Sequence, residues 1–249
     1  MSGHSKWATI KHQKGAKDKA RGKLFAKLIR QVEVAAREGG GDLDANATLR
    51  TMYNKARAAS VPIDTIDRAI KRGTGELEGV TYESVTYEGY APGGVALLIE
   101  VLTDNRNRAG SEVRSSFSRL GGSLAEPGSV SWQFTRTGVI YVPRSTSEDD
   151  VMLAALDAGA DDIVDEGDAW RLTTDPHNVD AVREALEKAS IEVTSAESTM
   201  LASTTIEVTG VDEAKKVLRI MDALEDLDDV QEVYSNFDIP DQILADVGG

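Results

Sequence analysis

Residues 139–195 read VIYVPRSTSEDDVMLAALDAGADDIVDEGDAWRLTTDPHNVDAVREALEKASIEVTS, and the spacing of their apolar residues predicts the fold class. Short apolar runs typical of strands alternate there with segments of helical spacing. The predicted strands are 139–142, 163–165, 169–173 and 191–195, and the predicted helices are 149–158 and 179–189. The order strand, helix, strand, strand, helix, strand is that of a ferredoxin-like domain.

The segments on either side of this unit carry the two halves of a second one. Before it, strands are predicted at 85–87, 95–102 and 130–134, with a helix at 109–120; after it come a strand at 205–208, a helix at 214–224 and a strand at 230–234. We therefore expect one ferredoxin-like domain, residues 135–202, inserted between the halves of another, residues 80–134 and 203–240.

The N-terminal residues 1–75 differ from the rest. Leu24, Leu28 and Val32 recur at helical spacing until the glycine run 39–41, and two further amphipathic segments follow before Gly73. The expected fold class is α+β: an N-terminal three-helix bundle with a basic tail, followed by two ferredoxin-like α/β domains, one inserted between the halves of the other.

Charge is divided unequally along the chain. Residues 1–75 hold sixteen Lys or Arg and seven Asp or Glu, a net charge of +9. The net charge of the whole chain is −14, so the remaining residues carry a net charge of −23. Such asymmetry points to nucleic acid or another anionic surface. A membrane is the poorer partner, because before Leu24 only Trp7 and Ile10 could insert among lipids.

The predicted nucleic-acid-binding residues combine positive charge with flat rings, a combination that suits phosphate and base. They are His4, Lys6, Trp7, Lys11, His12, Lys14, Lys17, Lys19, Arg21, Lys23, Lys27, Arg30, Arg68, Lys71 and Arg72. The alternative is a disordered solubilising tail with no partner, since charge runs are often only solvated.

A second anion site is predicted at Asn105, Arg106, Asn107 and Arg108, where a strand gives way to a helix. Backbone N–H groups at a helix N-terminus and arginine side chains both bind anions. The alternative is that Asp104 caps the helix and the arginines are solvated.

Catalytic chemistry has few candidate residues. The chain has no cysteine and three histidines, and it shows neither a GxSxG elbow nor a GxxxxGK phosphate loop. Asp161, Asp162, Asp165, Glu166 and Asp168 could chelate a divalent cation, but a solvated acidic turn explains them as well. We expect no enzyme activity, no catalytic residue, no cofactor and no metal, with a metal-dependent enzyme as a lower-ranked alternative.

Several motifs resemble the YebC/PmpR family. They are Gly3-His4-Ser5-Lys6-Trp7, Arg21-Gly22-Lys23-Leu24-Phe25, Ile66-Asp67-Arg68-Ala69-Ile70, Tyr87-Glu88-Gly89-Tyr90, Pro92-Gly93-Gly94, Thr103-Asp104-Asn105-Arg106-Asn107-Arg108, Gly128-Ser129-Val130 and Asp229-Val230-Gln231. They follow one another in the family's order over nearly the whole chain, so the resemblance is specific.

The resemblance implies a three-domain cytoplasmic protein without catalytic activity. Bacterial members are usually described as probable transcriptional regulatory proteins that bind DNA, mitochondrial relatives as translational activators of cytochrome oxidase, and others as ribosome-associated factors. Our leading hypothesis is therefore a DNA-binding regulator of gene expression. The alternative is a translation factor that binds ribosomal RNA, with the ribosome as its further expected partner, because phosphate contacts alone do not distinguish the two nucleic acids.

Overall fold

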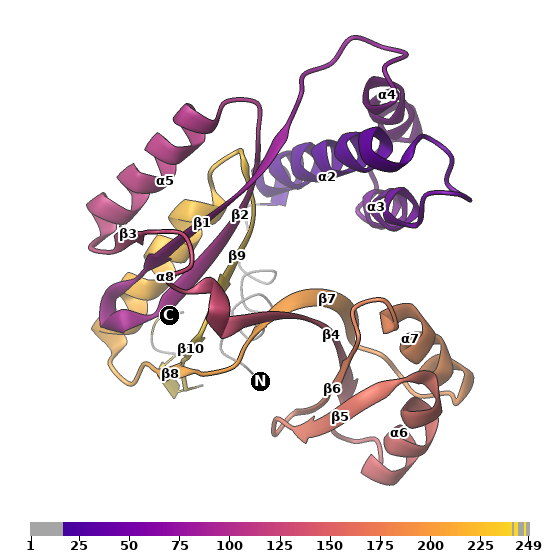
Figure 1. Ribbon diagram of the computed structural model, residues 1–249. Coiled ribbons are helices and arrows are strands. Elements are labelled where there is room, and N and C mark those ends of the chain that lie inside the picture. Colours follow the sequence, from indigo (N-terminus) through magenta and orange to yellow (C-terminus); the bar gives the residue numbers. More distant parts are fainter. Residues whose placement is uncertain (1–16, 241, 244–246, 248–249) are drawn as a thin grey trace.

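The computed structural model describes residues 17–240, 242–243 and 247, which form three parts (Figure 1). The N-terminal part consists of helices, and each of the other two contains a four-stranded antiparallel sheet with helices packed on one face. The predicted fold class is thereby confirmed. The domain boundaries drawn from the sequence stay a prediction.

The N-terminal part is a bundle of α2 (Lys17–Gly39), α3 (Ala47–Ala58) and α4 (Ile63–Gly73). Val32, Leu49 and Ile66 are fully buried between the helices, as their helical spacing predicts. Helices α2 and α4 approach each other closely at Gly73, where any Cβ would collide with the main-chain oxygen of Glu33. Gly73 therefore lets the two helices pack together as well as ending α4.

Two buried polar side chains hold the bundle together. Asn46 caps α3, because its Oδ1 accepts the N–H of Leu49 at 3.0 Å, and its Nδ2 donates to the carbonyl oxygens of Ala35 and Gly40, both at 2.8 Å. The carboxylate of Glu33, also buried, pairs with Arg72 at 2.8 Å and Arg37 at 3.3 Å. These contacts satisfy polar groups that burial would otherwise leave unpaired.

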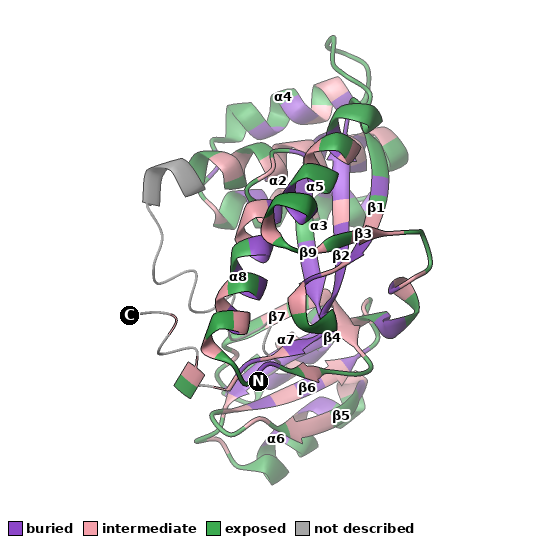
Figure 2. Cartoon of the chain, turned by 90° about the vertical axis from the view of Figure 1, so that its left-hand side faces the viewer, coloured by how far each residue is buried: buried purple, intermediate pink, exposed green. Residues whose placement is uncertain are grey.

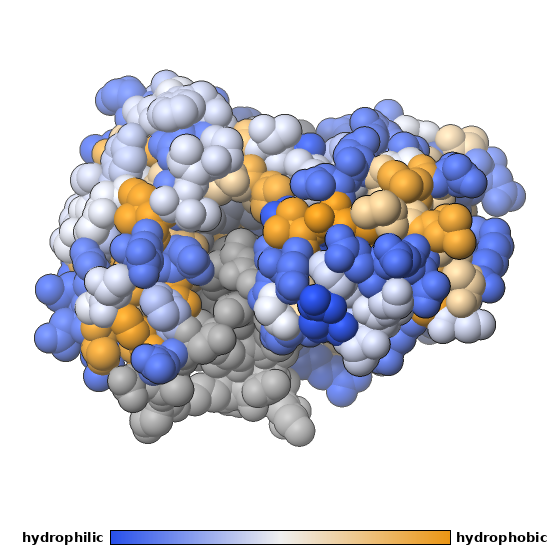
Figure 3. Space-filling model, turned by 90° about the horizontal axis from the view of Figure 1, so that it is seen from below, coloured by the Kyte–Doolittle hydropathy of each residue, from blue (hydrophilic) through white to orange (hydrophobic). Residues whose placement is uncertain are grey.

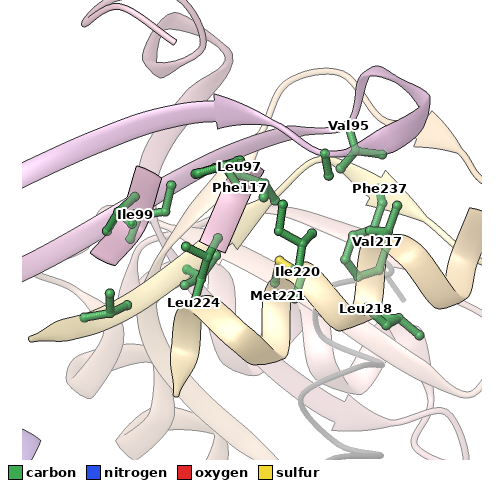
Figure 4. Packing of buried hydrophobic residues seen from close by; sticks show 14 of the residues in the cluster. Val95, Leu97, Ile99, Phe117, Val217, Leu218, Ile220, Met221, Leu224 and Phe237 are labelled. Atoms are coloured by element: carbon green, nitrogen blue, oxygen red, sulfur yellow. The ribbon is translucent and has the colours of Figure 1, made fainter. Parts of the chain in front are cut away.

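The first sheet has the order β3-β1-β2-β9 and carries α5 (Arg106–Leu120) and α8 (Val211–Glu225) on one face. Its strands are β1 (Glu83–Tyr90), β2 (Ala96–Thr103), β3 (Ser123–Ala125) and β9 (Val230–Ser235). The central strand β2 is buried over most of its length, whereas α5 is buried on one side only (Figure 2). Phe117 of α5 and Ile220 of α8 point toward the sheet and pack around Leu97 (Figure 4).

The order of strands in this sheet departs from the expected unit in one respect. A ferredoxin-like sheet places its third strand between the first two; here β1, which comes before both in the chain, lies between β2 and β3. The predicted strand 205–208 is reduced to β8 (Ile206–Glu207), which pairs in parallel with β10 (Phe237–Asp238) outside the four-stranded sheet. The place expected for it is thus filled by β1.

The second sheet has the order β5-β6-β4-β7, that of a ferredoxin-like unit. Its elements are β4 (Phe134–Pro143), α6 (Glu148–Ala155), η3 (Leu156–Ala158), β5 (Ala160–Asp165), β6 (Ala169–Thr174), α7 (Val179–Lys188) and β7 (Ser195–Ala202). β7 begins at the end of the predicted strand 191–195. The reason is that Ile191 still donates its N–H to the carbonyl of Leu186, at the C-terminal end of α7.

The predicted strand 130–134 is wrong except for its last residue, since residues 131–133 form the 3-10 turn η2 (Ser131–Gln133). The buried carboxylate of Glu88 accepts the N–H groups of Gly128, Val130 and Ser131 at 2.7, 2.6 and 2.9 Å. These donors are therefore unavailable to a strand ladder. Burial alone would raise the pKa of Glu88, but the three donors outweigh it and lower the pKa.

We expect the substitution Glu88→Gln to lower the free energy of unfolding by about 1–3 kcal/mol, because an amide N–H₂ would face a main-chain donor that it cannot satisfy. Urea unfolding measures the change. The control is Glu83→Gln at the exposed start of the same strand, which should stay within about 0.5 kcal/mol of the wild type. Equal effects of the two substitutions would show that the carboxylate does not hold the turn.

Candidate nucleic-acid interface

The basic tail divides between residues that the structure describes and residues that it does not. His4, Lys6, Trp7, Lys11, His12 and Lys14 lie outside the described residues. Lys17 and Lys19 belong to the first turns of α2, but their side chains are likewise not described. The side chains of the predicted interface are described from Arg21 onward. The exposed guanidinium of Arg21 lies 5.3 Å from the ring centre of Phe25.

One face of α2 docks on an acidic loop of the chain itself. We call residues 225–229, which are the last residue of α8 and the four residues after it, the acidic loop. Lys23 Nζ lies 2.9 Å from Asp226 Oδ1. Further along α2, Lys27 Nζ donates to the main-chain oxygen of Glu225 at 3.0 Å, and Arg30 Nη1 donates to that of Asp228 at 2.6 Å. Three of the predicted nucleic-acid-binding side chains thus already contact oxygen atoms of the protein.

Asp229 is the centre of this contact. Its buried carboxylate accepts from Arg30 Nη1 at 2.9 Å, Arg108 Nη2 at 2.6 Å and Thr103 Oγ1 at 2.8 Å. Burial would raise the pKa of Asp229, but the hydrogen bonds from Arg108 and Thr103 and the positive charges of both arginines outweigh it and lower the pKa. The ionised carboxylate therefore links α2 to the strands β2 and β9.

The predicted anion site at residues 105–108 is partly occupied by this network. Asn105, not Asp104, caps α5, since its Oδ1 accepts the N–H of Arg108 at 3.1 Å. The guanidinium of Arg108 lies between the carboxylates of Asp104 and Asp229, at 2.7 and 2.6 Å, and both raise its pKa. Arg106 and Asn107 are exposed. Of the four residues, Arg108 already has anionic partners within the chain, and binding of an external anion here stays a prediction.

Helix α4 presents exposed basic side chains to solvent. Arg68 and Lys71 are exposed, and no ion pair within the described part of the chain involves them. Arg72, in contrast, is turned toward the bundle, where its Nε donates to the buried carboxylate of Glu33 at 2.8 Å. Arg68 and Lys71 are thus available to an external phosphate, whereas Arg72 has a structural contact.

The acidic loop is a partner of α2 that was not predicted from the sequence. The run of acids after α8 was a signal, but its meaning depends on contacts between residues about two hundred positions apart, such as Lys23 and Asp226. Carboxylate and carbonyl oxygens bind the same lysine and arginine side chains that phosphate oxygens do. The acidic loop therefore binds Lys23, Lys27 and Arg30, which the sequence predicted to bind nucleic acid.

The part built on the second sheet has the opposite charge. Residues 135–202 hold fifteen Asp or Glu and five Lys or Arg. Seen from below, hydrophilic side chains surround apolar patches on the right-hand part of the surface (Figure 3), and Leu153 of α6 is 81% exposed. A surface this acidic repels phosphate, so the nucleic-acid interface is not expected there.

The candidate cation site lies in the same part. Asp165 pairs with Arg144 at 3.1 Å, and Glu166 pairs with Arg171 at 2.6 Å. Among the residues that the structure describes, no group of three or more His, Cys, Asp or Glu is arranged to hold a metal ion.

None of the helices in the described ranges combines the length and hydropathy needed to span a bilayer.

Two family models together match most of the chain. The model described as the TACO1/YebC protein N-terminal domain matches residues 5–76. The model described as the TACO1/YebC second and third domain matches residues 82–237. The break between the two matches falls within the segment that joins α4 to β1.

Individual proteins are similar over nearly their full length. A probable transcriptional regulatory protein of Beutenbergia cavernae is 57% identical over 248 residues, 98% of each chain. One of Thermobifida fusca is also 57% identical, over 99% of this chain and 100% of its own. A conserved hypothetical protein of Aquifex aeolicus, known from a crystal structure, has a TM-score of 0.79 and 45% identity, covering 93% of this chain and 96% of its own.

Proposed function

The chain belongs to the TACO1/YebC family, and on that basis we propose that it regulates gene expression by binding nucleic acid, without catalysing a reaction. DNA is the first candidate target, since the similar proteins of Beutenbergia cavernae and Thermobifida fusca are named probable transcriptional regulatory proteins. The proposal places the protein in the cytoplasm, with ribosomal RNA and the ribosome as the alternative target.

The observation that carries the proposal is the separation of charge. A net charge of +9 on residues 1–75 beside −23 on the remainder concentrates attraction for a polyanion at one end of the chain. Arg68 and Lys71 add exposed positive charge from α4, on the same bundle that the tail enters through α2. The acidic part built on the second sheet disfavours contacts there, which would orient the bundle toward the nucleic acid.

Contacts of α2 with the acidic loop refine the proposal. Lys23, Lys27 and Arg30 are held by protein oxygens, so they are available to phosphate only if the acidic loop is displaced. We therefore assign the primary contacts to the tail and to Arg68 and Lys71. The α2 face is assigned a secondary role that depends on release of the loop.

We expect the double substitution Arg68→Gln/Lys71→Gln to reduce the slope of log K against log salt by up to about 1.8 on duplex DNA, since each lost phosphate contact removes about 0.9. Fluorescence titrations at several salt concentrations measure the slope. The matched control is Arg183→Gln/Lys188→Gln, which removes two positive charges from α7, where both side chains pair with acids of the same helix. Equal slopes for both variants would remove α4 from the interface.

Crosslinking in cells, followed by sequencing of the attached nucleic acid, separates the two candidate targets. Enrichment of promoter DNA supports the transcriptional version. Enrichment of ribosomal RNA would overturn it in favour of a ribosome-associated translation factor, which the basic tail would serve equally well because its phosphate contacts do not read sequence or sugar.

A further inference from the structure

A basic cavity lies on the helical side of the first sheet, far along the chain from the basic tail. Its volume is about 390 Å³, and it opens where the C-terminal end of α5 meets the middle of α8 and the 3-10 turn η1 (Pro92–Gly94). It is lined by Pro92, Arg119, Leu120, Gly121, Lys216 and Arg219. Three of these six residues are cationic, and none is acidic.

The fold brings the three cations together from two helices. Val217 and Ile220 of α8 are fully buried against the sheet, which turns Lys216 and Arg219 toward solvent. Arg119 lies in the last turn of α5, just before Gly121 ends the helix in the left-handed conformation. Helices α5 and α8 run beside each other on the same face of the sheet (Figure 1), so their exposed cations face one cavity.

The cluster lacks counterions within the described part of the chain. No ion pair there involves Arg119, Lys216 or Arg219, and the one side-chain hydrogen bond is a long one, from Arg119 Nε to the main-chain oxygen of Ser115 at 3.4 Å. Glu213, at the start of α8, packs against Gly93 and does not line the cavity. Three adjacent cations in a cavity whose lining holds no acid repel one another, and an external anion would relieve that repulsion.

The backbone at the mouth of the cavity is accessible as well. Gly93, Gly94 and Gly121 are exposed and have φ angles of +80°, +77° and +79°. A Cβ at Gly94 would meet no atom within 4 Å, so Gly94 borders open space, whereas the side chain of Glu213 lies over Gly93. Glycine at such positions allows a ligand to come close to the main chain.

The chemistry of the cavity matches a phosphate on an extended chain. Guanidinium groups bind phosphate oxygens in pairs, and an ammonium group adds a point charge. Sites for small metabolites enclose the ligand, whereas this cavity is wide open to solvent, and its three charged lining residues are exposed. A sugar-phosphate backbone lying across the surface fits these features better than an enclosed small molecule does.

We propose that Arg119, Lys216 and Arg219 form a second phosphate-binding site, which contacts the backbone of the nucleic acid that the N-terminal part binds. The site rests on the proposed function, because the N-terminal part provides the main attachment. Glu100 and Glu232 on the opposite face of the first sheet border a cleft toward α2 and α3, so the helical bundle and the second site lie on different sides of the sheet. A nucleic acid that reaches both must pass around the sheet edge.

The test compares two variants of the full chain, Lys216→Gln/Arg219→Gln and the control Arg183→Gln/Lys188→Gln. The probe is a single-stranded RNA several times longer than the roughly 4–16 nucleotides that one small binding fold covers. We expect the first variant to reduce the slope of log K against log salt by up to about 1.4, at about 0.7 per contact, and the control to leave it unchanged. Thermal midpoints should match, since exposed charges contribute only about 0–1 kcal/mol.

Three outcomes would overturn the proposal. An unchanged slope for Lys216→Gln/Arg219→Gln, with wild-type binding intact, removes the second site and leaves the proposed function standing. Saturable binding of inorganic phosphate at the Gly121 amide signal, together with that unchanged slope, assigns the cavity to a free anion. Failure of the wild-type chain to bind either RNA or DNA at low salt removes the proposed function and the second site with it.

Discussion

Deletion of residues 2–19 is expected to have the largest effect on nucleic-acid binding. It removes Lys6, Lys11, Lys14, Lys17 and Lys19. If all five contact phosphate, the slope of log K against log salt should fall by about 4.5 on duplex DNA, or about 3.5 on a single strand. The tail should carry this large share because the acidic loop already engages Lys23, Lys27 and Arg30 on α2.

The substitution Trp7→Ala serves as the control for charge. If the indole stacks on a base, its loss should weaken binding by about 1–3 kcal/mol and leave the salt slope unchanged, since stacking releases no counterion. A truncated chain that binds DNA and ribosomal RNA with wild-type affinity and slope would show that the tail only solubilises the protein. The interface would then have to be sought on α4 and at the α5 and α8 cavity.

The largest expected effect on stability is that of Asp229→Ala. Removing one partner of a buried ion pair typically costs about 3–5 kcal/mol, and the lower end applies here because the Arg108 side chain is 44% exposed. The substitution leaves Thr103 without its buried acceptor and frees Arg30 from the carboxylate that ties α2 to the first sheet. At about 2–4 °C per kcal/mol for a chain of this size, the thermal midpoint should fall by roughly 6–12 °C.

Asp228→Ala is the matched control for this experiment. It removes the same charge from the same loop, but Asp228 is exposed and contacts Arg30 through its main-chain oxygen, which alanine retains. Its thermal midpoint should stay close to that of the wild type. If both substitutions shift the midpoint equally, the carboxylate of Asp229 does not organise the contact.

The contribution of Asp229 to stability is expected to depend on pH. The folded protein holds the pKa of Asp229 below its ordinary value of 3.8, so the stabilisation is complete above the unfolded pKa and is lost as pH falls through the lower folded one. The difference in stability between wild type and Asp229→Ala should therefore begin to shrink as the pH falls below about 4 and go on shrinking toward the lower folded pKa. Unfolding curves measured between neutral pH and that range test the sign.

The sequence alone determined the elements whose residues repeat with a regular period. Leu28 and Val32 of α2 are buried where helical spacing placed them, because burying one apolar stripe is a local requirement on a helix. Charge is likewise additive along a chain, so the basic end could be recognised without a fold. Contacts between the backbone and distant side chains could not be recognised in this way. The predicted strand at 130–134 is an example, because Glu88, over forty residues away, accepts the N–H groups of Val130 and Ser131.

Which basic residues are open to a ligand was decided by the tertiary structure. In sequence, Lys23 and Arg30 look like Arg68 and Lys71, yet the first two meet the acidic loop and the latter two face solvent. Arg119 and Lys216 are separated by almost a hundred residues and share a cavity because α5 and α8 pack on one sheet face. Composition and periodicity are properties of neighbours in the chain, whereas the pairing or exposure of a charge depends on which distant oxygen atoms the fold brings within a few ångströms of it.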